Sequence, residues 1–133
     1  MSLLKPSGLA HVLVVDDEPS VRMFATRVLI EEGFAVHEAG DGAEALERIA
    51  AAQQVALVVT DVVMPRMHGV ELLERITVQY PHVRVLLMSA YTSADLRDQG
   101  ISAPCGMLAK PFTADELVEH VRRCLDEQVR QEA

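Results

Sequence analysis

Short apolar runs alternate with longer amphipathic segments along most of the chain. Runs such as VLVV, VALVVT and VRVLLM are almost continuously apolar, which is typical of parallel strands covered by helices on both faces of a sheet. Turn residues separate these runs from the segments that follow them. The pattern predicts five short strands, at Val12–Val15, Ala35–Ala39, Val55–Thr60, Val83–Met88 and Gly106–Ala109.

The segments between the strands have the apolar spacing of helices that bury one face. From Pro19, apolar residues recur at three- and four-residue intervals up to Gly33, so a helix is expected there. A second helix is expected after Asp41, which can cap it, with Glu44 in its first turn. The other predicted helices are Val70–Tyr80, a weakly apolar and mobile fourth helix at 93–100, and a fifth that starts with the capping box Thr113–Glu116.

Five strands that alternate with five helices predict an α/β fold with a parallel sheet and right-handed crossovers. We expect a doubly wound, three-layer α/β/α sandwich with the flavodoxin-like strand order 2-1-3-4-5. In such sheets, ligands bind beyond the carboxyl ends of the strands. Polar residues that directly follow the predicted strands are therefore the candidates for function.

Composition and charge narrow the class of protein. The 133 residues suffice for one domain, half of them are hydrophobic, and the net charge is −8. An acidic chain is repelled by phosphate backbones, so a direct nucleic-acid partner is not expected. With neither a membrane span nor a signal pattern in the sequence, we expect a cytoplasmic protein. The expected organisation is a leader at 1–10, a domain at 11–128 and a tail at 129–133.

The two cysteines give no sign of redox chemistry in the sequence. Cys105 and Cys124 do not form a CxxC pair, and two cysteines are too few for a disulfide-stabilised scaffold. We therefore expect two small buried hydrophobic residues that are not bonded to each other.

Four of the five predicted strands end in polar residues. Asp16 and Asp17 follow the first strand, Asp61 the third, Ser89 the fourth and Lys110 the fifth. Each alone has an ordinary structural explanation, as a helix cap, a turn residue or a solvated charge. Together, three carboxylates at one sheet edge repel one another and raise each other's pKa unless a cation compensates them.

The expected cations are Lys110 and a divalent metal ion. Oxygen donors from two loops, without His or Cys, suit Mg²⁺ or Mn²⁺ far better than zinc. A carboxylate beside a metal ion, a hydroxyl and an ammonium is arranged to attack phosphorus and to form an aspartyl phosphate. We therefore interpret Asp61 as a nucleophile rather than as a metal ligand alone.

The segments VLVVDDEPSVR, VVTDVVMPRMHG, VLLMSAY and MLAKPF together resemble the receiver domain of two-component response regulators. The resemblance covers roughly residues 11–128. It implies that Asp61 is the phosphoacceptor, that Asp16, Asp17 and the main-chain carbonyl of Val63 bind Mg²⁺ with it, and that Ser89 and Lys110 contact the phosphoryl group.

The resemblance also implies partners and a switch. A sensor histidine kinase or histidine phosphotransfer protein would donate the phosphoryl group, and the face formed by the fourth helix, fifth strand and fifth helix would act on an output domain or protein. Homodimerisation is a further possibility. Ala90 would keep the phosphoryl pocket open, and Pro111 would follow a cis peptide bond that aims the lysine. Tyr91 would shield the phosphoryl group from water, and Met107 replaces the aromatic residue usual in the family's switch.

Two other functions compete with this interpretation. A receiver-like binding module that works without phosphorylation is expected to lack the acid pair, the phosphoacceptor or the lysine, and none of these is missing here. A phosphatase with an aspartyl intermediate is expected to carry a second Asp two residues after the nucleophile, where this chain has Val63. Its short loops also leave little room for a second substrate.

Overall fold

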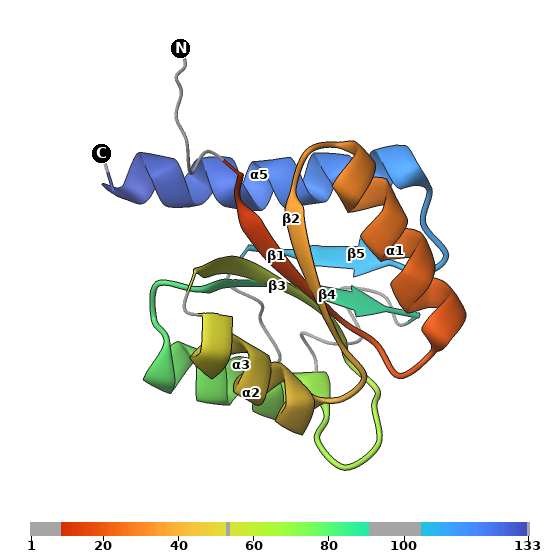
Figure 1. Cartoon of the computed structure of the whole chain (residues 1–133), viewed down its shortest axis with the longest axis vertical. Coiled ribbons are helices and arrows are strands. Elements are labelled where there is room, and N and C mark those ends of the chain that lie inside the picture. Colours follow the sequence, from red (N-terminus) through yellow and green to blue (C-terminus); the bar gives the residue numbers. More distant parts are fainter. Residues whose placement is uncertain (1–8, 53, 91–104, 133) are drawn as a thin grey trace.

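A five-stranded parallel sheet forms the centre of the molecule (Figure 1). The computed structural model describes residues 9–52, 54–90 and 105–132. The strand order is β2-β1-β3-β4-β5, which confirms the predicted topology. The strands are β1 His11–Val15, β2 Ala35–Ala39, β3 Val55–Asp61, β4 Arg84–Ser89 and β5 Met107–Ala109. The helices of the described part are α1 Pro19–Glu31, α2 Gly42–Ala52, α3 Gly69–Gln79 and α5 Ala114–Glu132.

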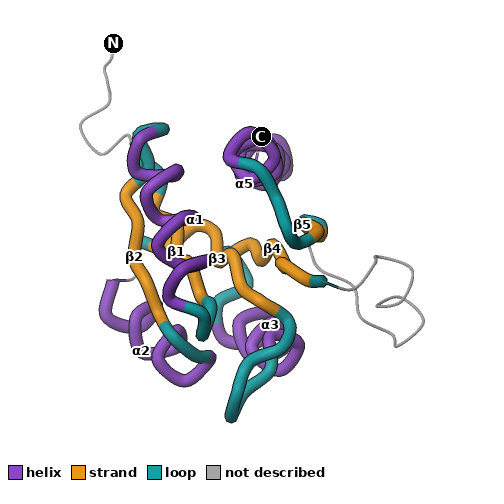
Figure 2. The backbone as a smooth tube through the Cα atoms, turned by 90° about the vertical axis from the view of Figure 1, so that its right-hand side faces the viewer, coloured by secondary structure: helices purple, strands orange, loops and turns teal. Residues whose placement is uncertain are grey.

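The helices cover both faces of the sheet and give it the predicted three layers (Figure 2). Helices α1 and α5 pack against one face, where Leu29 and Leu117 are fully buried beside strand residues such as Val14. Helices α2 and α3 cover the other face, where Ile49 and Ile76 are buried. The central strands contact helices on both sides, which explains why their sequences are apolar at nearly every position.

The N-termini of α2 and α5 show the capping that the sequence predicted. The Glu44 main-chain N–H donates to Asp41 Oδ1 at 2.9 Å, so Asp41 caps α2. At α5 the capping box is complete, because the Glu116 N–H donates to Thr113 Oγ1 at 3.1 Å and the Thr113 N–H donates to Glu116 Oε1 at 2.8 Å. The predicted fourth helix lies outside the described residues.

The strands end at one edge of the sheet in a shared register, which places the residues that follow them side by side. The registered pairs at this edge are Val15 with Thr60, Asp61 with Met88, and Ser89 with Ala109. Because the strands are parallel, this edge is formed entirely by carboxyl ends.

The expectation for the two cysteines is wrong. Cys105 and Cys124 form a disulfide bond, with their Cα atoms 5.2 Å apart. The sequence separation of 19 residues gave no sign of this, because the contact arises only when α5 packs beside the segment that leads into β5. The predicted burial holds for Cys124, which is fully buried.

None of the helices in the described part of the chain combines the length and the apolar character that crossing a bilayer requires.

Candidate functional site

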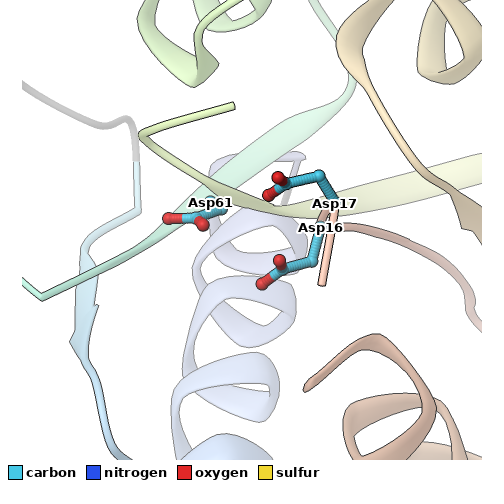
Figure 3. A group of neighbouring side chains, drawn as sticks. All are labelled: Asp16, Asp17 and Asp61. Carbon is cyan, nitrogen blue, oxygen red and sulfur yellow. The ribbon is translucent and has the colours of Figure 1, made fainter. Parts of the chain in front are cut away.

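Three carboxylates gather at the carboxyl edge of the two central strands. Asp16 and Asp17 directly follow β1, and Asp61 is the last residue of β3. One carboxylate oxygen from each lies within 4.8 Å of those of the other two, and Figure 3 shows the three groups beside one another. Asp16 is fully buried and Asp61 is 9% exposed, whereas Asp17 faces solvent. The carboxylates that the sequence predicted to cluster are thus brought together.

Lys110, one residue beyond β5, joins two of these carboxylates. Its ammonium donates to Asp16 Oδ2 at 2.9 Å and to Asp61 Oδ2 at 3.0 Å. Burial acts to lower the pKa of Lys110, but the two hydrogen-bonded carboxylates outweigh that effect and hold the pKa above its ordinary value. The side chain therefore stays cationic at neutral pH. The peptide bond between Lys110 and Pro111 is cis, as the resemblance implied.

The environment of Asp61 opposes its ionisation. Burial is the main reason that the pKa of Asp61 lies above its ordinary value, and repulsion from Asp16 adds to the effect. Lys110 and the Val63 N–H, which donates to Asp61 Oδ1 at 3.4 Å, work in the opposite direction. A further positive charge nearby would therefore stabilise the ionised form of Asp61.

The donor set fits a hard divalent cation. Three carboxylates face a single ammonium, so the cluster keeps an excess of negative charge when all of them are ionised. Its ligand atoms are all oxygens, and the described residues of the cluster include neither His nor Cys, which matches the preference of Mg²⁺. The ligand role of the Val63 carbonyl stays a prediction.

The described residues include three further members of the predicted site, Ser89, Ala90 and Met107. Ser89 is buried at the end of β4, one position beyond Met88, the register partner of Asp61. Ala90 follows it and is exposed. Met107, in β5, is half-buried and packs against the core on the face that α2 and α3 cover. Tyr91 lies outside the described residues.

A hollow of about 400 Å³ opens beside Lys110. Its wall includes Val21 and Phe24 from α1, and Pro111 and Phe112 from the segment after β5. The Phe24 ring lies 6.1 Å from that of Phe112 between centroids and is 43% exposed. An apolar surface thus lies open next to the charged cluster. The sequence did not predict it, because its residues come from segments that only the fold brings together.

Sequence analysis also missed Arg22, in the second turn of α1. Its Nη1 donates to the main-chain carbonyl of Asp16 at 2.7 Å, and its Nε donates to Glu38 at 3.1 Å. Arg22 belongs to the motif VLVVDDEPSVR, but its distance of six residues from Asp16 does not reveal which atom it contacts. Only the path of the β1–α1 loop brings the guanidinium back to that carbonyl.

Known proteins resemble the chain over nearly its whole length. The family model of the response regulator receiver domain matches residues 12–122. Sensor kinase CckA of Brucella abortus (strain 2308) is 40% identical over 124 residues, which make up 92% of this chain and 13% of that protein. Sporulation initiation phosphotransferase F of Bacillus subtilis (strain 168) is 34% identical over 117 residues, 86% of this chain and 92% of that protein.

Comparison with solved structures points to the same family. The solved structure of chemotaxis protein CheY4 from Vibrio cholerae matches with a TM-score of 0.80 and 32% identity, over 87% of this chain and 98% of that one. The family model and a relative of similar length therefore agree with the observed topology. The chain belongs to the response regulator receiver domain family, the signalling switch of two-component systems.

Proposed function

We propose that this domain accepts a phosphoryl group on Asp61 in a reaction that depends on Mg²⁺, with Mn²⁺ as a possible substitute. The observation that carries the proposal is the cluster itself: Asp16, Asp17 and Asp61 lie within 4.8 Å of one another, and Lys110 bridges two of them. A carboxylate so placed is a suitable nucleophile for phosphorus. Membership of the receiver family supports this role.

The residues of the chain account for most of the reaction. A carboxylate oxygen of Asp61 attacks phosphorus, the bond between phosphorus and the donor's imidazole nitrogen breaks, and that nitrogen keeps the electron pair. Lys110, already 3.0 Å from Asp61 Oδ2, donates to the phosphoryl oxygens as charge moves onto them. When bound, a divalent cation at Asp16, Asp17, Asp61 and the Val63 carbonyl supplies further neutralisation. Attack of water on the acyl phosphate returns the Asp61 carboxylate and releases inorganic phosphate.

The phosphoryl group is proposed to act as a switch through the neighbouring strands. Added charge on Asp61 draws the Ser89 hydroxyl and Lys110 toward it. Ser89 is the last residue of β4, and Lys110 directly follows β5, the strand next to β4. The change would reach an output domain or protein through β5, α5 and the predicted fourth helix, with Ala90, Tyr91 and Met107 in the switching region.

A protein donor fits the surface beside the cluster. The relatives include a sensor kinase and a phosphotransferase, which supports a histidine kinase or histidine phosphotransfer protein as the source of the phosphoryl group. The apolar hollow between Phe24 and Phe112 opens next to Lys110, so a donor seated there would present its phosphohistidine to Asp61. Downstream partners and homodimerisation are proposed only as family properties.

The alternative of a binding module without phosphoryl transfer is less well supported. Such a module has no need for a partly buried ammonium shared between two carboxylates, an arrangement that costs desolvation energy. Here the acid pair, the candidate acceptor and the lysine are all present and grouped.

Intact mass measurement tests the proposal. With Mg²⁺ and acetyl phosphate, the wild-type protein should gain the mass of one phosphoryl group, and it should gain none in excess EDTA. Asp61→Asn should gain none under either condition, because an amide oxygen is a poor nucleophile. Asp115→Asn, an exposed position on α5, is the matched control and should behave as wild type. Absence of any gain in the wild type with Mg²⁺ would favour the binding module.

A further inference from the structure

The two acidic residues after β1 are held in very different ways. Asp16 is fixed at every polar atom: its N–H donates to the Ala39 carbonyl, and its Oδ1 and Oδ2 accept from the Glu18 N–H at 2.9 Å and from Lys110 at 2.9 Å. Asp17 is exposed, and its carboxylate accepts no hydrogen bond from the described residues. The direction of the Asp17 side chain therefore depends on its main chain.

Arg22 fixes that main chain. The Asp16 carbonyl that accepts from Arg22 Nη1 at 2.7 Å belongs to the peptide plane that links Asp16 to Asp17. Holding this oxygen sets the rotation of the plane, and the plane sets where the Cα–Cβ bond of Asp17 points. No other contact of this carbonyl is seen among the described residues.

The guanidinium is itself held from two sides. Nε donates to Glu38 Oε1 of β2 at 3.1 Å, and the side chain is only 22% exposed. Arg22 therefore connects α1, β2 and the end of β1 through one planar, fork-shaped group. Lysine, with one terminal nitrogen, cannot reproduce the two separate donors.

We propose that Arg22 is a positioning residue for the cation site, which orients Asp17 by holding the peptide plane between Asp16 and Asp17. The inference rests on the proposed function, because it assumes that the three carboxylates take up a divalent cation. It adds a residue that contacts neither the cation nor the phosphoryl group.

If Arg22 acts only through its charge, its removal should change cation affinity in the opposite direction from the change expected if it orients Asp17. The two roles can therefore be distinguished by experiment. Arg22 carries a positive charge close to the carboxylates, so removing it should tighten cation binding if charge alone matters. If Arg22 orients Asp17, removing it should weaken cation binding, and residues that orient ligands typically contribute about tenfold or more to metal affinity.

The test is Mn²⁺ titration of the unphosphorylated protein, followed by the electron paramagnetic resonance signal of free Mn²⁺. Arg22→Met should weaken binding about tenfold. Arg27→Met, an exposed arginine on the same helix, removes the same charge and should leave affinity within about twofold of wild type. Equal or tighter binding by Arg22→Met would overturn the inference.

Arg22→Lys keeps the positive charge and provides a second test of the proposal in case Arg22→Met does not fold. It should bind Mn²⁺ more weakly than wild type and more tightly than Arg22→Met, because it restores one donor of the two. Binding equal to wild type would mean that charge, not geometry, is what matters at position 22. A wild-type protein that binds no Mn²⁺ or Mg²⁺ would instead overturn the proposed function.

A second readout separates positioning from loss of folded protein. In the acetyl phosphate reaction, Arg22→Met should raise the Mg²⁺ concentration for half-maximal rate about tenfold and leave the rate at saturating Mg²⁺ nearly unchanged. A lower maximal rate with an unchanged half-saturation point would indicate partial unfolding and contradict a positioning role.

Discussion

Replacing Lys110 with methionine should slow phosphorylation by acetyl phosphate by a factor on the order of 10² to 10³, the usual effect of removing one preorganised charge donor. The ammonium lies 2.9 Å from Asp16 Oδ2 and 3.0 Å from Asp61 Oδ2, where, under the proposed function, it would also meet the incoming phosphoryl oxygens. Methionine is unbranched and only one heavy atom shorter than lysine, so mainly the charge and its hydrogen bonds are lost. The rate of phosphoryl gain by intact mass measures the effect.

The same substitution should not weaken cation binding. Without Lys110, three carboxylates face no ammonium, so Mn²⁺ affinity should rise or stay equal. A protein that binds the cation well and accepts phosphate poorly would separate the role of Lys110 from that of the acid cluster. Arg123→Met, which removes one charge from an exposed pair on α5, is the matched control. Wild-type phosphorylation rates in Lys110→Met would contradict the assigned role.

Replacing Gly69 with alanine should destabilise the domain by about 1–3 kcal/mol or more. Gly69 is the first residue of α3, and its N–H donates to the Val62 carbonyl at 2.8 Å. An added Cβ would come within 2.2 Å of the Asp61 main-chain oxygen and 3.0 Å of Val62 Cα. These are backbone atoms of Asp61 and Val62, so relief of the clash requires movement of α3 or of the end of β3. Urea denaturation followed by far-ultraviolet circular dichroism measures the loss.

Alanine substitutions at two other glycines, Gly42 and Gly40, should have smaller effects and serve as comparisons. At Gly42, a Cβ would meet the side chain of Met67 at 2.7 Å, and a side chain can move more easily than backbone, so a smaller loss is expected. At Gly40, the nearest atoms would lie 3.6 and 3.7 Å away, which is ordinary contact, so alanine should be nearly neutral. Equal urea midpoints for all three variants would show that close packing at Gly69 is not what limits substitution.

The sequence predicted the fold well where the physical signal is local. Apolar runs marked all five strands to within one residue at either end, as in β4, which begins at Arg84 instead of Val83. Capping residues marked helix starts for the same reason, because Asp41 and Thr113 bond within their own turn. The acid cluster was also predictable, since parallel strands bring their carboxyl ends to one edge.

Features that depend on packing between distant segments were not predictable. The Cys105–Cys124 bond needs α5 beside the approach to β5, and the Arg22 contact needs the β1–α1 loop to return its carbonyl to the helix. The close approach of Gly69 to Asp61 likewise follows from how α3 docks. The hydrophobic periodicity and the spacing of residues in the sequence do not indicate such contacts. The chemical roles assigned to the site residues, those of Asp61 and Lys110 as well as those of Ser89, Tyr91 and the Val63 carbonyl, stay predictions.

Chemical trapping of the acyl phosphate tests the central claim most directly. After incubation with acetyl phosphate and Mg²⁺, sodium borohydride reduces an aspartyl phosphate to homoserine, and peptide mass spectrometry then locates the reduced residue. We predict homoserine at position 61 alone. Homoserine at 16 or 17, or an unreduced aspartate at 61 in protein that has gained a phosphoryl group, would contradict the account.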